Sequence, residues 1–246
     1  MIHQPTAISR WEQAGAFTVH IYTAAGVVLA FLMVLAAISG NTVSALWLGG
    51  AAVIIDGTDG ALARRLRVQE RIPWFDGSLL DNIVDYLTYV FAPVILLWSA
   101  GYLPSGLPGM TVAVLPLLAS SFQFCRVDAK TDDHFFLGFP SYWNVVAFYA
   151  IVNHLDVTVL SLIIVGCSLL VFVPIKYVYP TRTVTARPIT LGLVGLWGLV
   201  CGTILLQMPH PNPLLINLSY LFLVYYFVLS LYLTLSHRPD IAPPRR

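Results

Sequence analysis

The sequence predicts an all-α polytopic membrane protein with eight transmembrane helices and with both the N and C termini on the cytoplasmic side. Three observations predict this fold: an apolar composition, a series of long apolar segments, and an alternating placement of basic residues. Of the 246 residues, 58% are hydrophobic and 10% are charged, with a mean hydropathy of +0.79. Soluble domains average about 25% charged residues. The composition therefore excludes an ordinary soluble domain, and we expect membrane lipid, and no nucleic acid, among its partners.

Apolar segments recur along the whole chain. They lie at roughly 17–38, 43–63, 79–98, 110–124, 142–153, 158–175, 190–208 and 214–234. A helix needs about 20 residues to cross the hydrocarbon core of a bilayer, and most of the segments have about this length. The fifth segment is short. Residues 1–16 carry scattered apolar anchors, which fit either an interfacial amphipathic helix or a frayed terminus.

The basic residues test this division of the chain. All 13 of them precede the first segment or follow an even-numbered one. The loops at 39–42, 99–109, 154–157 and 209–213 contain none. By the positive-inside rule this pattern places both termini in the cytoplasm, and it requires the short fifth segment as a span. We expect a single membrane domain over residues 1–246, with a catalytic helix pair at 43–98.

Four carboxylates at helical spacing lie between and within the second and third segments. Asp56 and Asp59 are three residues apart and Asp81 and Asp85 are four apart, so each pair shares one face of its helix. No helix breaker separates the pairs from their apolar segments, which indicates two neighbouring, antiparallel helices joined by an Arg-rich turn. With the membrane edge near Arg64, Asp56 lies roughly 12 Å inside the membrane, and Asp85 comes to about the same depth.

Such a layer of carboxylates needs compensating positive charge. An ionised Asp at the centre of a membrane helix costs about 2.5–3.5 kcal/mol on insertion scales. Four ionised Asp side chains that face one another also repel. A divalent metal site on the cytoplasmic side is the simplest explanation.

Several neighbours of the carboxylates have two interpretations. Gly57 and Gly60 either let a phosphate approach the backbone or permit close helix packing. Arg64 either contacts a phosphate or anchors the helix at the cytoplasmic surface. Asp81 could belong to a capping box that begins at Ser78, whereas Asp76 is better explained as a helix-start residue than as a ligand.

These residues together resemble the signature of the CDP-alcohol phosphotransferases. The matching positions are Asp56-x2-Asp59-Gly60-x2-Ala63-Arg64 and Gly77-x3-Asp81-x3-Asp85. Twelve residues, 65–76, separate the two halves, where most members have eight. This departure, with the stretches 16–31, 80–93, 130–144 and 179–188, resembles the bacterial members that join free choline to CDP-diacylglycerol.

The resemblance implies a metal-assisted displacement in a bacterial inner membrane, with the active site facing the cytoplasm. Two Mg²⁺ or Mn²⁺ ions would be held by Asp56, Asp59, Asp81 and Asp85. It further implies that Asp85 is the general base for choline's hydroxyl and that CMP is released. The nucleotide and phosphates would be bound by residues of the motif, namely Asp59, Gly60, Ala63, Arg64 and Gly77.

Choline carries a quaternary ammonium that aromatic faces bind well. Tyr86 follows Asp85, and Tyr142, Trp143 and Asn144 lie at an expected cytoplasmic interface, so these four are the candidate choline-binding residues. Tyr and Trp are also common at membrane interfaces as anchors, which leaves a structural interpretation open.

Other functions fit parts of the pattern. Within the family, the acceptor could be serine, inositol or glycerol phosphate. An intramembrane prenyltransferase also uses Asp pairs and Mg²⁺, but lacks the Gly-Ala-Arg continuation. A cation-coupled transporter would carry buried carboxylates, but internal repeat symmetry is expected there and we find none. Gly192, Gly195, Gly198 and Gly202 form a small-residue stripe that indicates a close helix contact, with a homodimer face as the alternative.

Overall fold

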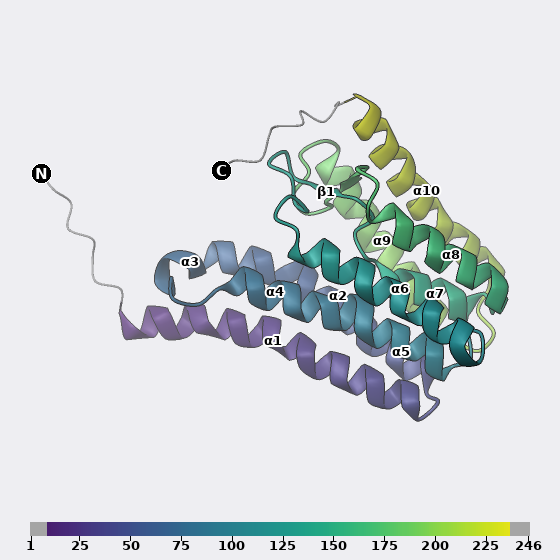
Figure 1. Cartoon of the computed structure of the whole chain (residues 1–246). Coiled ribbons are helices and arrows are strands. Elements are labelled where there is room, and N and C mark those ends of the chain that lie inside the picture. Colours follow the sequence, from purple (N-terminus) through teal and green to yellow (C-terminus); the bar gives the residue numbers. More distant parts are fainter. Residues whose placement is uncertain (1–8, 237–246) are drawn as a thin grey trace, which may run out of the picture. The chain divides into compact units, whose positions relative to one another are not determined.

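The computed structural model describes residues 9–236, which fold mainly into helices (Figure 1). The chain divides into two compact units, Met1–Ala100 and Gly101–Arg246, and each unit is described by itself. The first contains α1 (Arg10–Ile38), α2 (Thr42–Arg65), α3 (Val68–Arg71), α4 (Gly77–Asp85), the π-helix η1 (Tyr86–Phe91) and α5 (Ala92–Ser99). The second contains α6 (Gly106–Cys125), β1 (Phe135–Leu137), α7 (Trp143–Val152), α8 (Val157–Leu170), β2 (Lys176–Val178), α9 (Arg187–Leu206) and α10 (Pro213–Ser236).

The first unit is built against α1. This helix contacts α2, α3, α4, η1 and α5. It begins with a capping box: the hydroxyl of Ser9 accepts the backbone N–H of Glu12, whose carboxylate accepts the backbone N–H of Ser9. Its 29 residues span about 43 Å, which exceeds the ~30 Å hydrocarbon core. Residues 1–8 lie outside the described part of the chain, and the interfacial helix expected over 1–16 stays a prediction.

The connection between α2 and α4 is fixed to the start of α1. Val68 and Ile72, from α3 and the residue after it, are buried with Ala16 and Val19 of α1. An ion pair of 3.4 Å joins Arg71 to Glu12 beside this apolar cluster. The twelve-residue spacing between the two halves of the motif is therefore taken up by an ordered helical turn.

The third apolar segment forms one helical rod, Gly77–Ser99, with a π-helical stretch in its middle. The backbone N–H of Ala92 donates to the carbonyl of Leu87, five residues earlier. The next residue, Pro93, has no N–H to donate, and in a regular α-helix its ring would clash with the carbonyl of Tyr89. The wider π turn accommodates this proline, and such turns are frequent at functional sites. The sequence analysis did not anticipate it.

The second unit contains two helix pairs and a small sheet. α6 packs against α8, and α9 packs against α10. The sheet is antiparallel, with Phe135 opposite Val178 and Leu137 opposite Lys176. Side chains of α10 complete it: Ser230 accepts the N–H of Val178. Over residues 9–236 the fold is thus helical except for this sheet. The sheet pairs the loop after the fourth apolar segment with the loop after the sixth, both of which were predicted to be cytoplasmic.

All eight predicted apolar segments form helices, but their lengths differ. Among the described residues, six helices are long and apolar enough to cross a membrane, which agrees with a polytopic membrane protein. The two shorter ones, α7 and α8, have 10 and 14 residues. At 1.5 Å per residue, α7 covers only about 15 Å. The count of eight spans and the cytoplasmic placement of the termini therefore stay predictions.

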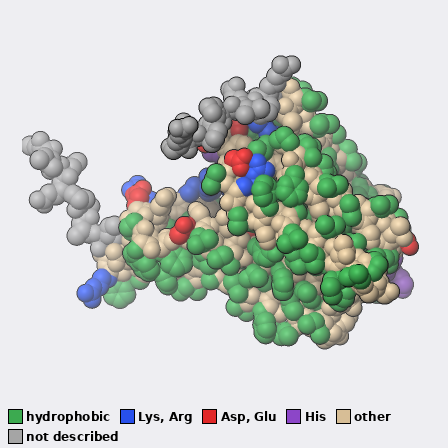
Figure 2. Space-filling model, viewed as in Figure 1, with side chains coloured by type: hydrophobic (Ala, Val, Ile, Leu, Met, Phe, Trp, Pro, Cys, Tyr) green, Lys and Arg blue, Asp and Glu red, His purple; other side chains and the backbone are tan. Residues whose placement is uncertain are grey.

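The helices expose apolar side chains as a membrane protein requires. Figure 2 shows hydrophobic side chains over much of the visible surface. Leu199, Leu206 and Leu235 are each at least 72% exposed, and Ile54 and Phe31 are above 60%. Apolar surface on this scale is unfavourable in water and is stabilised by lipid.

Candidate active site

Three carboxylates of the first unit meet in one cluster. Asp56 of α2 and Asp81 and Asp85 of α4 each contribute an oxygen, and these oxygens lie within 4.8 Å of one another. All three residues are partly buried. Ionised carboxylates this close repel unless a cation lies among them. Oxygen ligands from carboxylates suit Mg²⁺ and Mn²⁺, so the donor set fits a divalent ion.

The fourth predicted carboxylate, Asp59, lies one turn further along α2. It is 6% exposed, and the hydroxyl of Thr23 on α1 donates a hydrogen bond of 2.7 Å to its Oδ2. Within residues 9–236 it does not belong to the three-carboxylate cluster. α1 therefore holds this side chain through Thr23.

The three-carboxylate cluster itself also accepts a hydrogen bond from a hydroxyl group. Tyr89 of η1 donates a hydrogen bond of 2.7 Å to Oδ2 of Asp56. From the sequence Tyr89 was considered only as an aromatic neighbour of Asp85, and neither its hydrogen bond to Asp56 nor that of Thr23 to Asp59 was predicted. The available signals were the polar residues Thr18, His20 and Thr23 in the first apolar segment and a proline four residues after Tyr89.

The predicted glycines have different surroundings. A Cβ added at Gly57 would meet nothing within 4 Å. Helix packing therefore does not explain this glycine. At Gly60 an added Cβ would lie 3.3 Å from Nη1 of Arg64, so the guanidinium folds back over the glycine. At Gly77 it would lie 2.7 Å from Cε1 of His20. Gly77 thus lets α4 pack closely against α1.

The start of α4 shows which residue caps this helix. The carboxylate of Asp76 accepts the backbone N–H groups of Ser78 and Leu79, at 3.0 and 2.9 Å. Asp76 is therefore the N-cap, as expected of a helix-start residue. A capping box that begins at Ser78 is wrong, because Ser78 lies inside α4 and Asp76 is its N-cap. Ala63 packs against the apolar cluster formed by α1 and α3.

The predicted choline-binding residues lie in both units. Tyr86, in the first unit, is partly buried and directly follows Asp85. In the second unit Tyr142 is also partly buried, and its ring centroid lies 6.5 Å from that of Phe136.

The two residues that follow Tyr142 are held by the second unit itself. Trp143 is 1% exposed and donates its indole N–H to Ser120 at 2.8 Å. The side-chain oxygen of Asn144 accepts the N–H of Val145 at 2.9 Å.

Two ion pairs join charged side chains in the loops of the second unit. Arg126 hydrogen-bonds Asp128 through two nitrogens at 2.7 Å, which lowers the pKa of Asp128. Lys176 lies 2.7 Å from Asp133. Burial raises the pKa of Asp133, but hydrogen bonds from Lys176 and from Thr131 outweigh it and lower the pKa overall.

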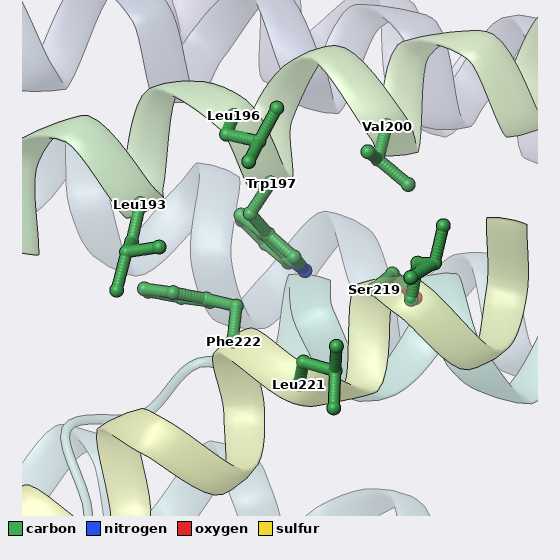
Figure 3. Close-up of a pocket in the computed structure, with 8 residues that line it drawn as sticks. Leu193, Leu196, Trp197, Val200, Ser219, Leu221 and Phe222 are labelled. Atoms are coloured by element: carbon green, nitrogen blue, oxygen red, sulfur yellow. The ribbon is translucent and has the colours of Figure 1, made fainter.

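The second unit also contains an apolar pocket of about 250 Å³ between α9 and α10 (Figure 3). Leucine, valine and aromatic side chains line it, and its polar atoms are used locally. Trp197 donates to the hydroxyl of Tyr149, which donates to Ser219. The pocket brings no reactive group together. The predicted glycine stripe on α9 faces open space at Gly192, Gly195 and Gly198, and a homodimer stays a prediction.

The fold and the site together define a polytopic membrane protein with a carboxylate centre on two adjacent helices. The model of the CDP-alcohol phosphatidyltransferase family matches residues 17–225. The chain belongs to this family, as the sequence motif predicted.

Curated relatives make the comparison more specific. The chain is 36% identical over 221 residues to a phosphatidylcholine synthase of Pseudomonas aeruginosa, covering 90% of this chain and 92% of the relative. It is 38% identical over 226 residues to that of Legionella pneumophila, with 89% and 88% covered. To that of Mesorhizobium japonicum it is 39% identical over 196 residues, with 80% and 73% covered.

Proposed function

We propose that this chain transfers the phosphatidyl group of CDP-diacylglycerol to choline and releases CMP, and so synthesises phosphatidylcholine. The observation that carries the proposal is the three-carboxylate cluster of α2 and α4, in a chain 36% to 40% identical to phosphatidylcholine synthases. In the reaction the hydroxyl oxygen of choline forms a bond to the phosphorus nearest diacylglycerol. The bond from that phosphorus to the oxygen of CMP breaks.

The acidic residues would hold the metal. Asp56, Asp81 and Asp85 supply clustered oxygens, and Asp59 is fixed one turn away, which together would suit two Mg²⁺ or Mn²⁺ ions. When bound, such ions neutralise the charge that develops on the transferred phosphate and on the leaving group.

The proton of choline's hydroxyl needs an acceptor, and we assign this role to Asp85. A general base must come within hydrogen-bonding reach of the proton that it removes. Asp85 ends α4 at the cluster, where an acceptor alcohol would face the phosphate.

The open side of α2 would bind the phosphates and nucleotide. Gly57 leaves room for a ligand, and the guanidinium of Arg64 lies over Gly60, one turn towards the expected cytoplasmic end. Arginine pairs well with phosphate oxygens. Ala63 and Gly77 would contribute by packing, since both contact protein at α1 or α3.

Choline recognition would use aromatic faces, each worth about 0.5–2 kcal/mol. Tyr86 and Tyr142 retain partial exposure and suit this role. Trp143 and Asn144 would act by fixing the helix start beside Tyr142, because Trp143 is 1% exposed and donates to Ser120.

The proposed setting is a bacterial inner membrane, with eight spans, both termini in the cytoplasm and the active site facing the cytoplasm. All 13 basic residues fall on the side that the positive-inside rule assigns to the cytoplasm. Membrane lipid would then receive the product directly, and a homodimer is part of this proposal. The alternative acceptors are serine, inositol and glycerol phosphate.

The decisive experiment measures phosphatidylcholine and CMP formed by purified protein from CDP-diacylglycerol, Mn²⁺ and labelled choline. Asp85→Asn removes the proposed base, and Asp76→Asn is the matched control because asparagine also caps a helix. We expect both products from the wild type and the control, and neither from Asp85→Asn. Product only with another acceptor supports the alternative, and no CMP with any acceptor contradicts the enzyme.

A further inference from the structure

The hydroxyl of Tyr89 provides a direct contact to the carboxylate centre from outside the family motif. It donates to Oδ2 of Asp56 at 2.7 Å. Tyr89 is 8% exposed and Asp56 is partly buried, so this hydrogen bond is partly shielded from water. Hydrogen bonds to an ionised acceptor in such surroundings are shorter and stronger than neutral ones.

The π-helix sets the direction of this contact. Tyr89 lies inside η1, between the cluster residue Asp85 and Pro93. The hydrogen bond from Ala92 to Leu87 spans five residues instead of four, which rotates the side chains of this turn relative to a regular α-helix. Pro93 keeps the turn in this form, because its ring excludes the regular hydrogen bond to Tyr89. The side chain of Tyr89 is thus fixed by its own backbone.

A carboxylate that binds metal must present the correct oxygen in the correct orientation. Asp56 is the cluster's contribution from α2, whereas Asp81 and Asp85 both come from α4. A donor on one oxygen of Asp56 restricts rotation of the whole carboxylate and offsets part of the repulsion within the cluster. Partners of this kind, which bind a ligand rather than the metal, typically change metal affinity by about 10–100-fold when they are removed.

We propose that Tyr89 is a positioning residue for the divalent-metal site, and that it acts by holding the carboxylate of Asp56 through its hydroxyl. This inference rests on the metal site of the proposed function. It assigns no contact between Tyr89 and choline or the nucleotide.

The test compares Tyr89→Phe with the wild type and with Tyr22→Phe. The control removes a hydroxyl that bonds Thr58 of α2 at 2.9 Å and does not contact a cluster residue. Binding of Mn²⁺ to each purified protein, without substrates, is measured from the electron paramagnetic resonance signal of free Mn²⁺. The choline KM is then measured at saturating Mn²⁺, and thermal unfolding without metal verifies that each variant is folded.

We expect Tyr89→Phe to raise the Mn²⁺ dissociation constant by about 10–100-fold. Its choline KM at saturating Mn²⁺ should stay within about twofold of the wild type, and Tyr22→Phe should match the wild type in both. Unchanged Mn²⁺ binding by Tyr89→Phe overturns the inference, as does a raised choline KM with normal Mn²⁺ binding. If the wild type binds no Mn²⁺ yet forms phosphatidylcholine, the inference fails while the proposed reaction stands.

Discussion

The two units place their charged side chains in opposite ways. In the first unit, Asp56, Asp81 and Asp85 lie within the helices of two candidate spans. In the second unit, no Asp, Glu or Lys lies within α6–α10, and the charged residues of the loops form pairs such as Lys176–Asp133. Its pocket between α9 and α10 is correspondingly apolar (Figure 3).

This difference distinguishes carboxylates inside a span from carboxylates in a loop. A carboxylate inside a span is costly, so its presence requires either a compensating cation or a function. A carboxylate in a loop has water and partners, and its presence requires neither. The location of a charge relative to the spans is therefore more informative than the number of charges.

The largest expected effect comes from removing one charge from each unit. Asp81→Asn should lower the rate of CMP release by about 100–10,000-fold, comparable to the loss of a catalytic acid–base group, because it removes a member of the carboxylate cluster. Asp132→Asn, an exposed loop residue of the second unit, should leave the rate within about twofold. Equal effects from the two substitutions would contradict the assignment of the catalytic carboxylates to the first unit.

A medium effect is expected from the glycines of the motif. Gly77→Ala places a methyl group 2.7 Å from Cε1 of His20, and overpacking of this kind costs about 1–3 kcal/mol. Gly57→Ala enters open space and should leave the unfolding temperature unchanged. Thermal unfolding in detergent measures both variants. A stable Gly77→Ala protein would show that His20 moves aside without cost.

The smallest effect concerns the ion pair of the second unit. The pKa of Asp133 is lowered in the folded protein, so the pair stabilises it above the unfolded pKa of about 4, and this contribution is lost as the pH falls below that value. Asp133→Asn should cost less than about 1 kcal/mol at neutral pH. Thermal unfolding between pH 7 and pH 3 should show the variant and the wild type converging. A difference that does not narrow as the pH falls from 7 to 3 would mean that charge is not the cause.

Much of the first unit follows from local sequence. The segment predicted at 43–63 is α2, Thr42–Arg65, and the spacing of Asp81 and Asp85 correctly places both on one helix face. Helical periodicity and the family motif suffice for this, because each pair of carboxylates is fixed by one helix. What brings Asp56 to Asp81 is packing between helices, and there the motif supplied the missing information.

Other features depend on contacts between distant segments. The sixth apolar segment was expected to reach residue 175, but α8 ends at Leu170. The apolar residues that follow, such as Val171 and Val178, are buried at the sheet instead of continuing a helix. Gly138, with φ of +83°, approaches the carbonyl of Val171 closely. No local periodicity in the sequence predicts that these two loops pair.

The site residues that were missed have a similar cause. From the sequence, Tyr89 is an aromatic neighbour of Asp85 with either an anchor or a choline-binding role, and Thr23 is a tolerated polar residue of a span. The role of each hydroxyl follows only from the folded structure, in which Tyr89 of the π turn donates to Asp56 and Thr23 of α1 donates to Asp59. The reverse holds for Trp143, which the sequence indicated as a candidate choline-binding residue at a cytoplasmic interface but which is 1% exposed.

The anchored turn after α2 has an energetic consequence. Ordering one residue of backbone costs roughly 1–2 kcal/mol in conformational entropy. Burial of the apolar cluster, which contains Ala16, Val19, Val68 and Ile72, offsets part of this entropy loss during folding. A substrate that binds between the two halves of the motif, as we propose, would therefore find their connection already ordered. Its binding energy would not be diminished by the loss of that freedom.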